Sequence, residues 1–394
     1  MKSLLTEIEP RDAAAPAPVY DGPGGEADAA RALPLAPARW DWTRVRRVLV
    51  VRLRSIGDTV LATPSLRALR RFLPDARIDI LLEDWVAPLL EGSEDVDRVV
   101  RVERGNTVGR IRAARELRAE RYDVAYDLHG GNTASLLTWA TRARERVGYA
   151  DYRHARLYDH TAPPSADLWR RERTHSAEQQ LALLGWTGVP VTDRPASRLP
   201  VSEEARERVA KRLAGAGVYD GRDFALLHTA AAFATKTWAA ENFARVVEHL
   251  GARGVVSVAV AAPNEAGVVE ELRKHSRVPF ASFTDLSLPE LVAVAARAAL
   301  FVGNDSGVAH IAAAHGVPSV VIFGSSNVFH WRPWTSAPAE VVREEMACAP
   351  CAGYRCDEFG APECIRRVSV ARVTAAVERV LAASGRAARD AGEV

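Results

Sequence analysis

Short runs of consecutive apolar residues alternate along the chain with longer segments in which apolar positions recur at helical spacing. The runs predict buried strands over 48–51, 78–82, 99–102, 123–128, 224–227, 255–261, 299–302 and 319–323. The other segments predict helices over 58–72, 86–90, 107–120, 238–251, 265–274, 307–315 and 368–384. Continuous apolar runs are typical of parallel strands, because helices cover both faces of a parallel sheet. The alternation predicts an α/β protein in which two Rossmann-like domains face a cleft.

Breaks in this pattern indicate the domain boundaries. Residues 1–43 are rich in Ala, Pro, Gly and Asp without periodicity, so we expect a disordered leader. Three prolines mark 187–200 as a linker between the two alternating sets. We therefore expect a first domain over 44–190, a second over 191–367 and a C-terminal segment over 368–394.

The composition narrows the class of protein. A length of 394 residues suits two or three domains. A net charge of +2 at pH 7 argues against a protein that coats nucleic acid. No apolar run approaches the roughly 18–20 residues of a membrane span, and the N-terminus lacks the apolar core of a secretory signal. We expect a cytoplasmic multidomain protein, a class in which enzymes predominate.

Ligands of such sheets bind beyond the carboxyl ends of the strands, so the loops there are candidate sites. The first loop runs from Arg54 through Ser55 and Gly57 to Asp58, where a helix is predicted to begin. Gly57 permits a tight turn or the close approach of a ligand. Asp58 is either the N-cap of that helix or a carboxylate that faces the cleft and accepts a proton. Arg52 and Arg54 are candidates for binding an anionic substrate.

Lysine is scarce in this chain, which makes one lysine informative. Of 52 basic residues only four are lysines, and Lys236 lies between Thr235 and Thr237 at the start of a predicted helix. Hydroxyls, amide dipoles and one cation converge there in a way that suits a phosphate group. The alternative is a solvated lysine beside a capping threonine.

A third loop, over 303–310, also joins a buried strand to a helix. Asp305 or Ser306 either caps that helix, or the free amides of Ser306 and Gly307 bind an anion. His310 lies one turn into the helix, where it either packs in the core or faces the cleft. Glu265, which follows another strand, either stabilises a helix start or accepts hydrogen bonds from a ribose diol.

All four cysteines lie within 17 residues, at Cys348, Cys351, Cys356 and Cys364. Their spacing, C-x2-C-x4-C-x7-C, is compatible with one structural zinc ion or an iron–sulfur centre. The alternatives are reduced thiols or one redox-sensitive disulfide.

The three loops together resemble glycosyltransferase family 9, the lipopolysaccharide heptosyltransferases that use ADP-heptose. The matching segments are VLVVRLRSIGDTVLATPSLRALRRFLPDARI at 48–78, HTAAAFATKTWAAENFARV at 228–246 and FVGNDSGVAHIAAAHGVPSVVIFG at 301–324. The resemblance implies a GT-B fold with an acceptor-binding domain first and a nucleotide-sugar-binding domain second. It also implies a C-terminal helix that returns to the first domain.

The resemblance assigns roles to the loop residues. Asp58 corresponds to the general base, and Lys236, with Thr235 and Thr237, to the contact with the donor phosphates. The other donor-site residues would be Glu265 at the ribose, together with Asp305, Ser306, Gly307 and His310. The acceptor-binding candidates are Arg52, Arg54, Ser55 and Gly57.

The chain departs from the family pattern in its donor loops. The family's His-Pro-Gly-Ala is His228-Thr229-Ala230-Ala231 here, Trp-Pro is Trp238-Ala239, and Gly-Pro-Thr-Asp-Pro is replaced at 324–328. These changes bear on the base and the sugar of the donor more than on the type of reaction.

The resemblance implies an inverting glycosyltransferase that needs no catalytic cofactor and no nucleic acid. It would move heptose or a related sugar from an ADP- or other NDP-sugar to a hydroxyl of a glycolipid or saccharide acceptor. Such an enzyme would be cytoplasmic, with peripheral contact to the cytoplasmic face of the inner membrane. The alternatives are an NDP-sugar epimerase or hydrolase of the same fold, and a non-catalytic sugar-nucleotide binding protein.

Overall fold

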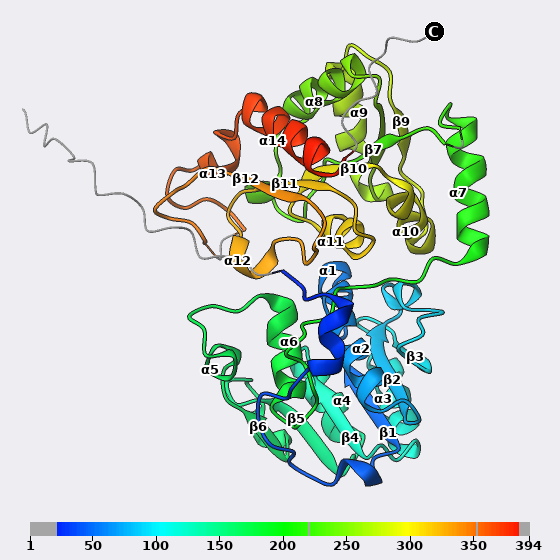
Figure 1. Cartoon of the computed structure of the whole chain (residues 1–394), viewed down its shortest axis with the longest axis vertical. Helices are drawn as coiled ribbons and strands as arrows, with labels where there is room; N and C mark the ends of the chain where they lie inside the picture. Colours follow the sequence, from blue (N-terminus) through cyan, green and yellow to red (C-terminus); the bar gives the residue numbers. More distant parts are fainter. Residues whose placement is uncertain (1–21, 220, 352–353, 386–394) are drawn as a thin grey trace, which may run out of the picture.

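The computed structural model describes residues 22–219, 221–351 and 354–385, and it contains two parallel six-stranded sheets (Figure 1). The first sheet has the order β3-β2-β1-β4-β5-β6. Its strands are β1 (Arg47–Val51), β2 (Arg77–Glu83), β3 (Arg98–Val102), β4 (Val124–Asp127), β5 (Glu145–Tyr149) and β6 (His160–Ala162). The second sheet has the order β12-β11-β10-β7-β8-β9. Its strands are β7 (Phe224–His228), β8 (Val256–Val260), β9 (Ala281–Phe283), β10 (Leu300–Asn304), β11 (Ser319–Phe323) and β12 (Ala339–Arg343).

Helices connect the strands within each half. Those of the first half are α1 (Ile56–Val60), α2 (Thr63–Phe72), α3 (Thr107–Ala119), α4 (Asn132–Ala140), α5 (Ser165–Trp169) and α6 (Ser176–Gly185). Those that follow are α7 (Glu203–Gly215), α8 (Ala240–Ala252), α9 (Ala266–His275), α10 (Leu288–Arg297), α11 (Gly307–Ala314), α12 (Val328–Trp331), α13 (Glu363–Arg366) and α14 (Val370–Ala383). Short 3-10 helices lie at η1 (Glu26–Arg31), η2 (Trp42–Arg44), η3 (Ala87–Leu89), η4 (Ala155–Leu157), η5 (Ala234–Lys236) and η6 (Pro263–Glu265).

The central strand of the first sheet shows why both of its faces are covered. Val48 and Val50 pack in the same core cluster as residues of α2 and α6, whereas Leu49 and Val51 pack with residues of α3 and α4. Successive side chains of a strand point to opposite faces, so a run of four apolar residues needs a helical layer on each side. The predicted α/β fold with two parallel sheets is confirmed, and each of the eight predicted strands is present.

The two halves meet through two short helices. Helix α1 follows the central strand β1, α11 follows the central strand β10, and the two helices contact each other at the junction of the halves (Figure 1). Because both helices begin at the carboxyl edge of a parallel sheet, this junction is where such sheets place their ligands.

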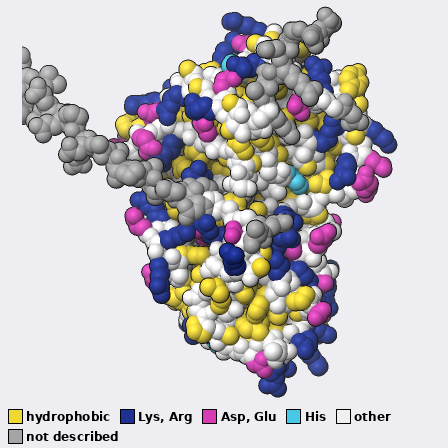
Figure 2. All heavy atoms as spheres, in the orientation of Figure 1, with side chains coloured by type: hydrophobic (Ala, Val, Ile, Leu, Met, Phe, Trp, Pro, Cys, Tyr) yellow, Lys and Arg dark blue, Asp and Glu magenta, His cyan; other side chains and the backbone are white. Residues whose placement is uncertain are grey.

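The surface carries mixed charge. Figure 2 shows Lys and Arg side chains interspersed with Asp and Glu over the face in view, in keeping with the small net charge. Across the described ranges, none of the helices has both the length and the apolar composition to cross a bilayer.

The prediction that residues 1–43 form a disordered leader is wrong for residues 22–43, while 1–21 lie outside the described residues. Trp42 is buried, and its Nε1 donates a hydrogen bond to the carbonyl of Thr187 at 3.0 Å. The backbone amide of Leu35 donates to the carbonyl of Gly185. Apolar side chains at 35, 40 and 42 give this segment a face to bury, although its composition resembles that of a flexible chain.

The prediction that the C-terminal helix returns to the first domain is also wrong. Helix α14 packs on α8, β11 and β12 of the second half (Figure 1). Its Val373, Val377 and Val380 belong to the same core cluster as Leu227 of β7. The apolar stripe of α14 therefore completes one face of the second sheet.

Candidate active site

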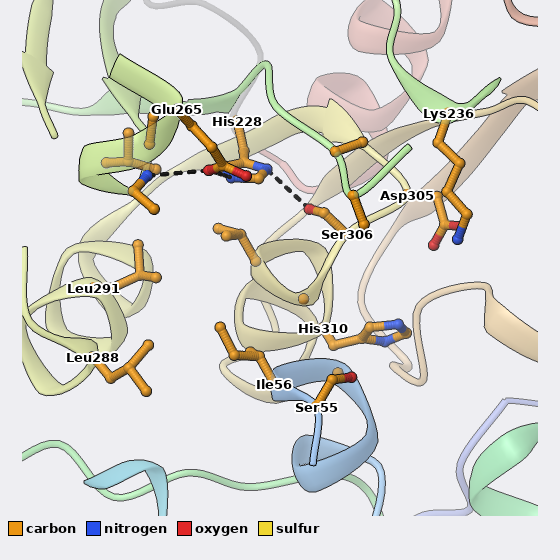
Figure 3. Close-up of a pocket in the computed structure, with 18 of the residues that line it drawn as sticks. Ser55, Ile56, His228, Lys236, Glu265, Leu288, Leu291, Asp305, Ser306 and His310 are labelled. Carbon is orange, nitrogen blue, oxygen red and sulfur yellow. Dashed lines mark hydrogen bonds and ion pairs between the residues drawn. The ribbon is translucent and has the colours of Figure 1, made fainter. Parts of the chain in front are cut away.

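A cavity of about 590 Å³ lies between the two halves, and nine of the predicted site residues line it. Three come from the first half and six from the second: Ser55, Gly57, Asp58, Lys236, Glu265, Asp305, Ser306, Gly307 and His310. Figure 3 labels Ser55, Lys236, Glu265, Asp305, Ser306 and His310 among them. The loops that the sequence singled out thus converge on one space, although the chain separates Asp58 from Lys236 by more than 170 residues.

Two glycines allow the halves to touch at this cavity. A Cβ built at Gly57 would lie 2.7 Å from Cδ2 of His310, and one built at Gly307 would lie 2.7 Å from Cβ of Ile56. Neither distance leaves room for a methyl group, so these glycines serve the close approach of α1 to α11.

Gly307→Ala is expected to lower the thermal stability, because the added methyl group must displace Ile56 or separate the halves. Overpacking of this kind costs about 1–3 kcal/mol. Gly267→Ala is the matched control, since a Cβ at Gly267 of α9 meets nothing within 4 Å. Thermal unfolding of the two variants measures the difference. Equal melting temperatures would contradict the close contact between the halves.

Asp58 is not the N-cap of its helix, as one of the two interpretations had it: Ser55 is the N-cap, and Asp58 lies at the third helical position and lines the cavity. Its Oδ2 accepts hydrogen bonds from the amide of Ser55 at 3.3 Å and from the Ser55 hydroxyl at 3.1 Å, which is the geometry of a capping box. Its Oδ1 accepts from the guanidinium of Arg52. The carboxylate is therefore fixed in orientation while it still lines the cavity, which suits a group that must receive a proton from a bound substrate.

Lys236 lies at the end of η5, lines the cavity and forms an ion pair with Asp305. Its Nζ lies 2.8 Å from Oδ2 of Asp305, and the hydroxyl of Ser326 donates to the same oxygen at 2.5 Å. Asp305 is buried, with 6% of its surface exposed. The ammonium group is thus held beside the start of α11, where amide dipoles also favour an anion.

His228 was not among the predicted site residues, yet it joins two of them. Its Nδ1 lies 3.0 Å from the hydroxyl of Ser306, and its Nε2 lies 4.0 Å from Oε2 of Glu265 (Figure 3). Burial lowers the pKa of His228 to about 4, so the ring is neutral near pH 7. Its position at the end of β7, in a strand-end loop that the sequence had already singled out, was the available signal.

The ring of His310 lies at the junction of the two halves. Figure 3 shows it between Ser55 and Asp305. Burial lowers the pKa of His310, while the negative charges of Asp305 and Asp58 oppose that shift. Its Nδ1 is buried and has no hydrogen-bond partner within the described residues, while the residue itself lines the cavity.

We expect the free energy of unfolding to decrease as pH falls from about 6.5 towards 4. Burial lowers the pKa of His228 to about 4 and that of His175 to about 3, so both stay neutral in the folded protein while the unfolded chain takes up protons. Each contributes a slope of about 1.4 kcal/mol per pH unit in this window. Urea denaturation at several pH values measures the slope, and His228→Gln should reduce it. A free energy that stays constant on acidification would contradict the burial of these rings.

Four predicted residues do not line the cavity. Arg52 is buried behind Asp58 and also donates to the carbonyl of Leu128. The side chain of Arg54 is half exposed and lies 3.9 Å from a carboxylate oxygen of Glu83. The hydroxyl of buried Thr235 accepts from Ser325, and that of Thr237 donates to the carbonyl of Phe233. These four residues shape the loops around the site, and Lys236 alone of its triplet reaches the cavity.

The end of the cavity near Glu265 is apolar. Its walls include Val260, Leu286, Leu288 and Leu291. Two of these leucines lie in the first helical turns of α10, a helix that the sequence analysis did not predict. An apolar slot beside a carboxylate suits a flat heterocycle attached to a sugar with free hydroxyls.

The four cysteines do not form a metal site in this structure. All are free, and among the described residues, which omit 352 and 353, no three His, Cys, Asp or Glu side chains are placed to hold a metal ion. Burial and the nearby thiols raise the pKa of Cys364. The cysteine segment borders the loop after β11, since the amide of Cys351 donates to the carbonyl of Ser325 at 3.0 Å.

Comparisons with known proteins agree with this geometry. A family profile described as glycosyltransferase family 9 (heptosyltransferase) matches residues 110–361, more than half of the chain. Lipopolysaccharide heptosyltransferase 3 of Escherichia coli is 28% identical over 304 residues, which cover 72% of this chain and 85% of that protein.

Solved structures share the fold. The glycosyltransferase family 9 protein from Veillonella parvula superposes with a TM-score of 0.75 at 24% identity, over 86% of this chain and 97% of its own. The ADP-heptose lipopolysaccharide heptosyltransferase II of E. coli superposes with a TM-score of 0.71 at 21% identity, over 85% and 98%. This chain is therefore a glycosyltransferase and belongs to glycosyltransferase family 9, the heptosyltransferase family.

Proposed function

We propose that the protein transfers a heptose, or a closely related sugar, from an ADP-sugar or another NDP-sugar to a hydroxyl of a lipopolysaccharide-type glycolipid or saccharide, with inversion at the anomeric carbon. The observation that carries this proposal is that Asp58 and the Lys236–Asp305 pair line one cavity from opposite halves of the molecule. One side of the cavity offers a carboxylate for a proton, and the other offers positive charge for a leaving diphosphate.

The donor would lie on the second half. Its base fits the apolar slot near Leu288, its ribose hydroxyls reach Glu265, and its diphosphate lies at Lys236 and the amides that begin α11. The name of the E. coli heptosyltransferase II supports an ADP-heptose donor for that relative. We extend it to this chain as part of the proposal.

In the proposed reaction, the acceptor hydroxyl gives its proton to Asp58 as its oxygen attacks the anomeric carbon of the donor. The bond between that carbon and the phosphate oxygen breaks, and its electron pair leaves with the nucleoside diphosphate. Lys236 and the α11 amides stabilise the new negative charge, a contribution that is often the largest in reactions of this kind. Attack on the face opposite the leaving group inverts the anomeric centre.

Residues 44–190 would bind the acceptor and residues 191–367 the donor. We also propose that the enzyme works in the cytoplasm at the inner face of the membrane, where a glycolipid acceptor presents its sugar. No metal takes part in the proposed steps, because Lys236 and backbone amides supply the positive charge.

The four cysteines are free in this structure, and no step of the proposed reaction uses them. The structural centre inferred from their spacing stays a prediction, which metal analysis of the purified full-length protein tests.

A panel of nucleotide sugars tests the proposal. The protein is expected to gain thermal stability with ADP-heptose or a similar ADP-sugar, and to consume the donor only when an acceptor is present. Rapid loss of the donor without acceptor would favour an epimerase or hydrolase instead. Donor binding without any transfer would favour a binding protein.

A further inference from the structure

Helices α3 and α4 present large apolar side chains to solvent. Val108 and Ile111 of α3 are 68% and 49% exposed, and Leu136 and Trp139 of α4 are 53% and 38% exposed. The two helices contact each other, and their opposite faces pack on the same side of the first sheet. The four side chains therefore belong to one outer layer of the first half.

The same layer carries arginines that have no acidic partner among the described residues. Arg112, Arg115 and Arg118 follow Val108 and Ile111 at helical spacing, so the five share one face of α3. In the described part of the chain, the structure gives no ion pair to these three arginines or to Arg121 and Arg142. The acidic residues of the region are already engaged, since Arg98 pairs with both Glu116 and Glu120.

The layer is oriented towards the cavity. Helices α3 and α4 begin where β3 and β4 end, which is the same edge of the sheet as the loop that carries Asp58. Val108 and Ile111 lie at the start of α3, and the arginines extend away from that edge along the helix. The apolar end of the face is therefore its end closer to the candidate active site.

We propose that this α3–α4 face binds the surface of a bilayer that contains anionic lipids. Exposed aliphatic side chains and a tryptophan enter the interface between headgroups and acyl chains, while adjacent arginines bind the lipid phosphates. The guanidinium of Arg142 lies over the ring of Trp139, 4.4 Å from its centroid. The two side chains thus present an apolar and a charged group side by side. A nucleic acid would use the arginines but would leave Val108, Ile111 and Leu136 in water.

The inference uses the proposed function only to explain why a membrane would be near: a glycolipid acceptor would then reach Asp58 from the bilayer. Binding to lipid itself needs neither donor nor acceptor. It can therefore be tested separately from sugar transfer.

The test is co-sedimentation of the full-length protein with vesicles, without substrates. We expect binding to phosphatidylglycerol–phosphatidylcholine vesicles that weakens as salt is raised, and little binding to phosphatidylcholine alone. Each arginine near an anionic surface strengthens binding about fivefold. The triple variant R112Q/R115Q/R118Q should therefore bind about 100-fold more weakly. The control R206Q/R208Q/K211Q removes the same charge from the exposed face of α7 and should bind like the unaltered protein.

A second pair of variants tests the apolar part. I111S/L136S should reduce vesicle binding, whereas L33S, which changes an exposed leucine outside the face, should not. The proposal is overturned if anionic vesicles do not bind the protein, or if both triple variants bind equally. It is also overturned if light scattering shows that the unaltered protein is a dimer and that R112Q/R115Q/R118Q is a monomer.

Discussion

Asp58→Asn is expected to lower the rate of sugar transfer about 10²–10⁴-fold, which is the contribution that a general base typically makes. The variant keeps the shape of the side chain but cannot take the proton of the acceptor hydroxyl. The affinity for the donor should change little, because Asp58 belongs to the first half and the donor is proposed to bind the second. Steady-state kinetics with isothermal titration of the donor separates the two effects.

The control for this variant is Glu290→Gln on α10. Glu290 holds the same place in a capping box as Asp58, accepting from the amide of Ser287 at 2.9 Å and from its hydroxyl at 2.6 Å, but it does not line the cavity. If the cap alone mattered, both variants would lose activity through stability. Transfer by Asp58→Asn at the unaltered rate would remove Asp58 as the base.

Lys236→Ala is expected to weaken donor binding and to reduce turnover about 10²–10³-fold, because the departing diphosphate loses its one lysine contact. Donor affinity and turnover should both fall, because the charge of Lys236 stabilises the bound donor and, more strongly, the transition state. In Asp58→Asn only turnover is expected to fall. Within the described ranges, removing Lys236 leaves the hydroxyl of Ser326 as the remaining donor to Oδ2 of Asp305. A lower melting temperature is therefore expected as well.

Lys274→Ala is the matched control for the lysine. Lys274 lies on the surface of the same half, 70% exposed and paired with Glu271 at 3.0 Å, so its loss should leave donor affinity and turnover unchanged. A Lys236→Ala variant with wild-type donor affinity would mean that the diphosphate binds elsewhere.

The strands predicted from the sequence are those with continuous apolar runs, and the ones it missed are short or polar. β5 contains Glu145, Arg146 and Gly148, and β6 and β9 have three residues each. β6, β9 and β12 lie at the edges of the sheets, and β5 lies beside one edge. Edge strands are less buried than central strands, so they need fewer apolar residues. The hydrophobic pattern that would predict them is therefore weak.

The wrong placement of the C-terminal helix came from the family resemblance, because the apolar pattern itself shows only that one face of the helix is buried. The apolar stripe of α14 is equally compatible with either sheet, and only the structure shows it on β11 and β12. The predicted helix over 58–72 divides into α1 and α2 because Pro64 lies in the first turn of α2, where a missing amide hydrogen does no harm.

The sequence predicted those site residues that lie in loops at the carboxyl ends of strands. Asp58, Lys236 and Ser306 lie in such loops, and parallel sheets bring such loops to one edge. The contact of His310 with Gly57, and the bond between His228 and Ser306, depend on how the two halves meet. No local pattern encodes that arrangement.

The anomeric configuration of the transferred sugar tests the central claim most directly. With an ADP-sugar donor of defined configuration and a saccharide acceptor, nuclear magnetic resonance of the product reports whether the new bond lies on the opposite face of the sugar ring. If Asp58 and Lys236 act from opposite sides of one cavity in a single displacement, the product has the inverted configuration. A product with the configuration of the donor would contradict the account.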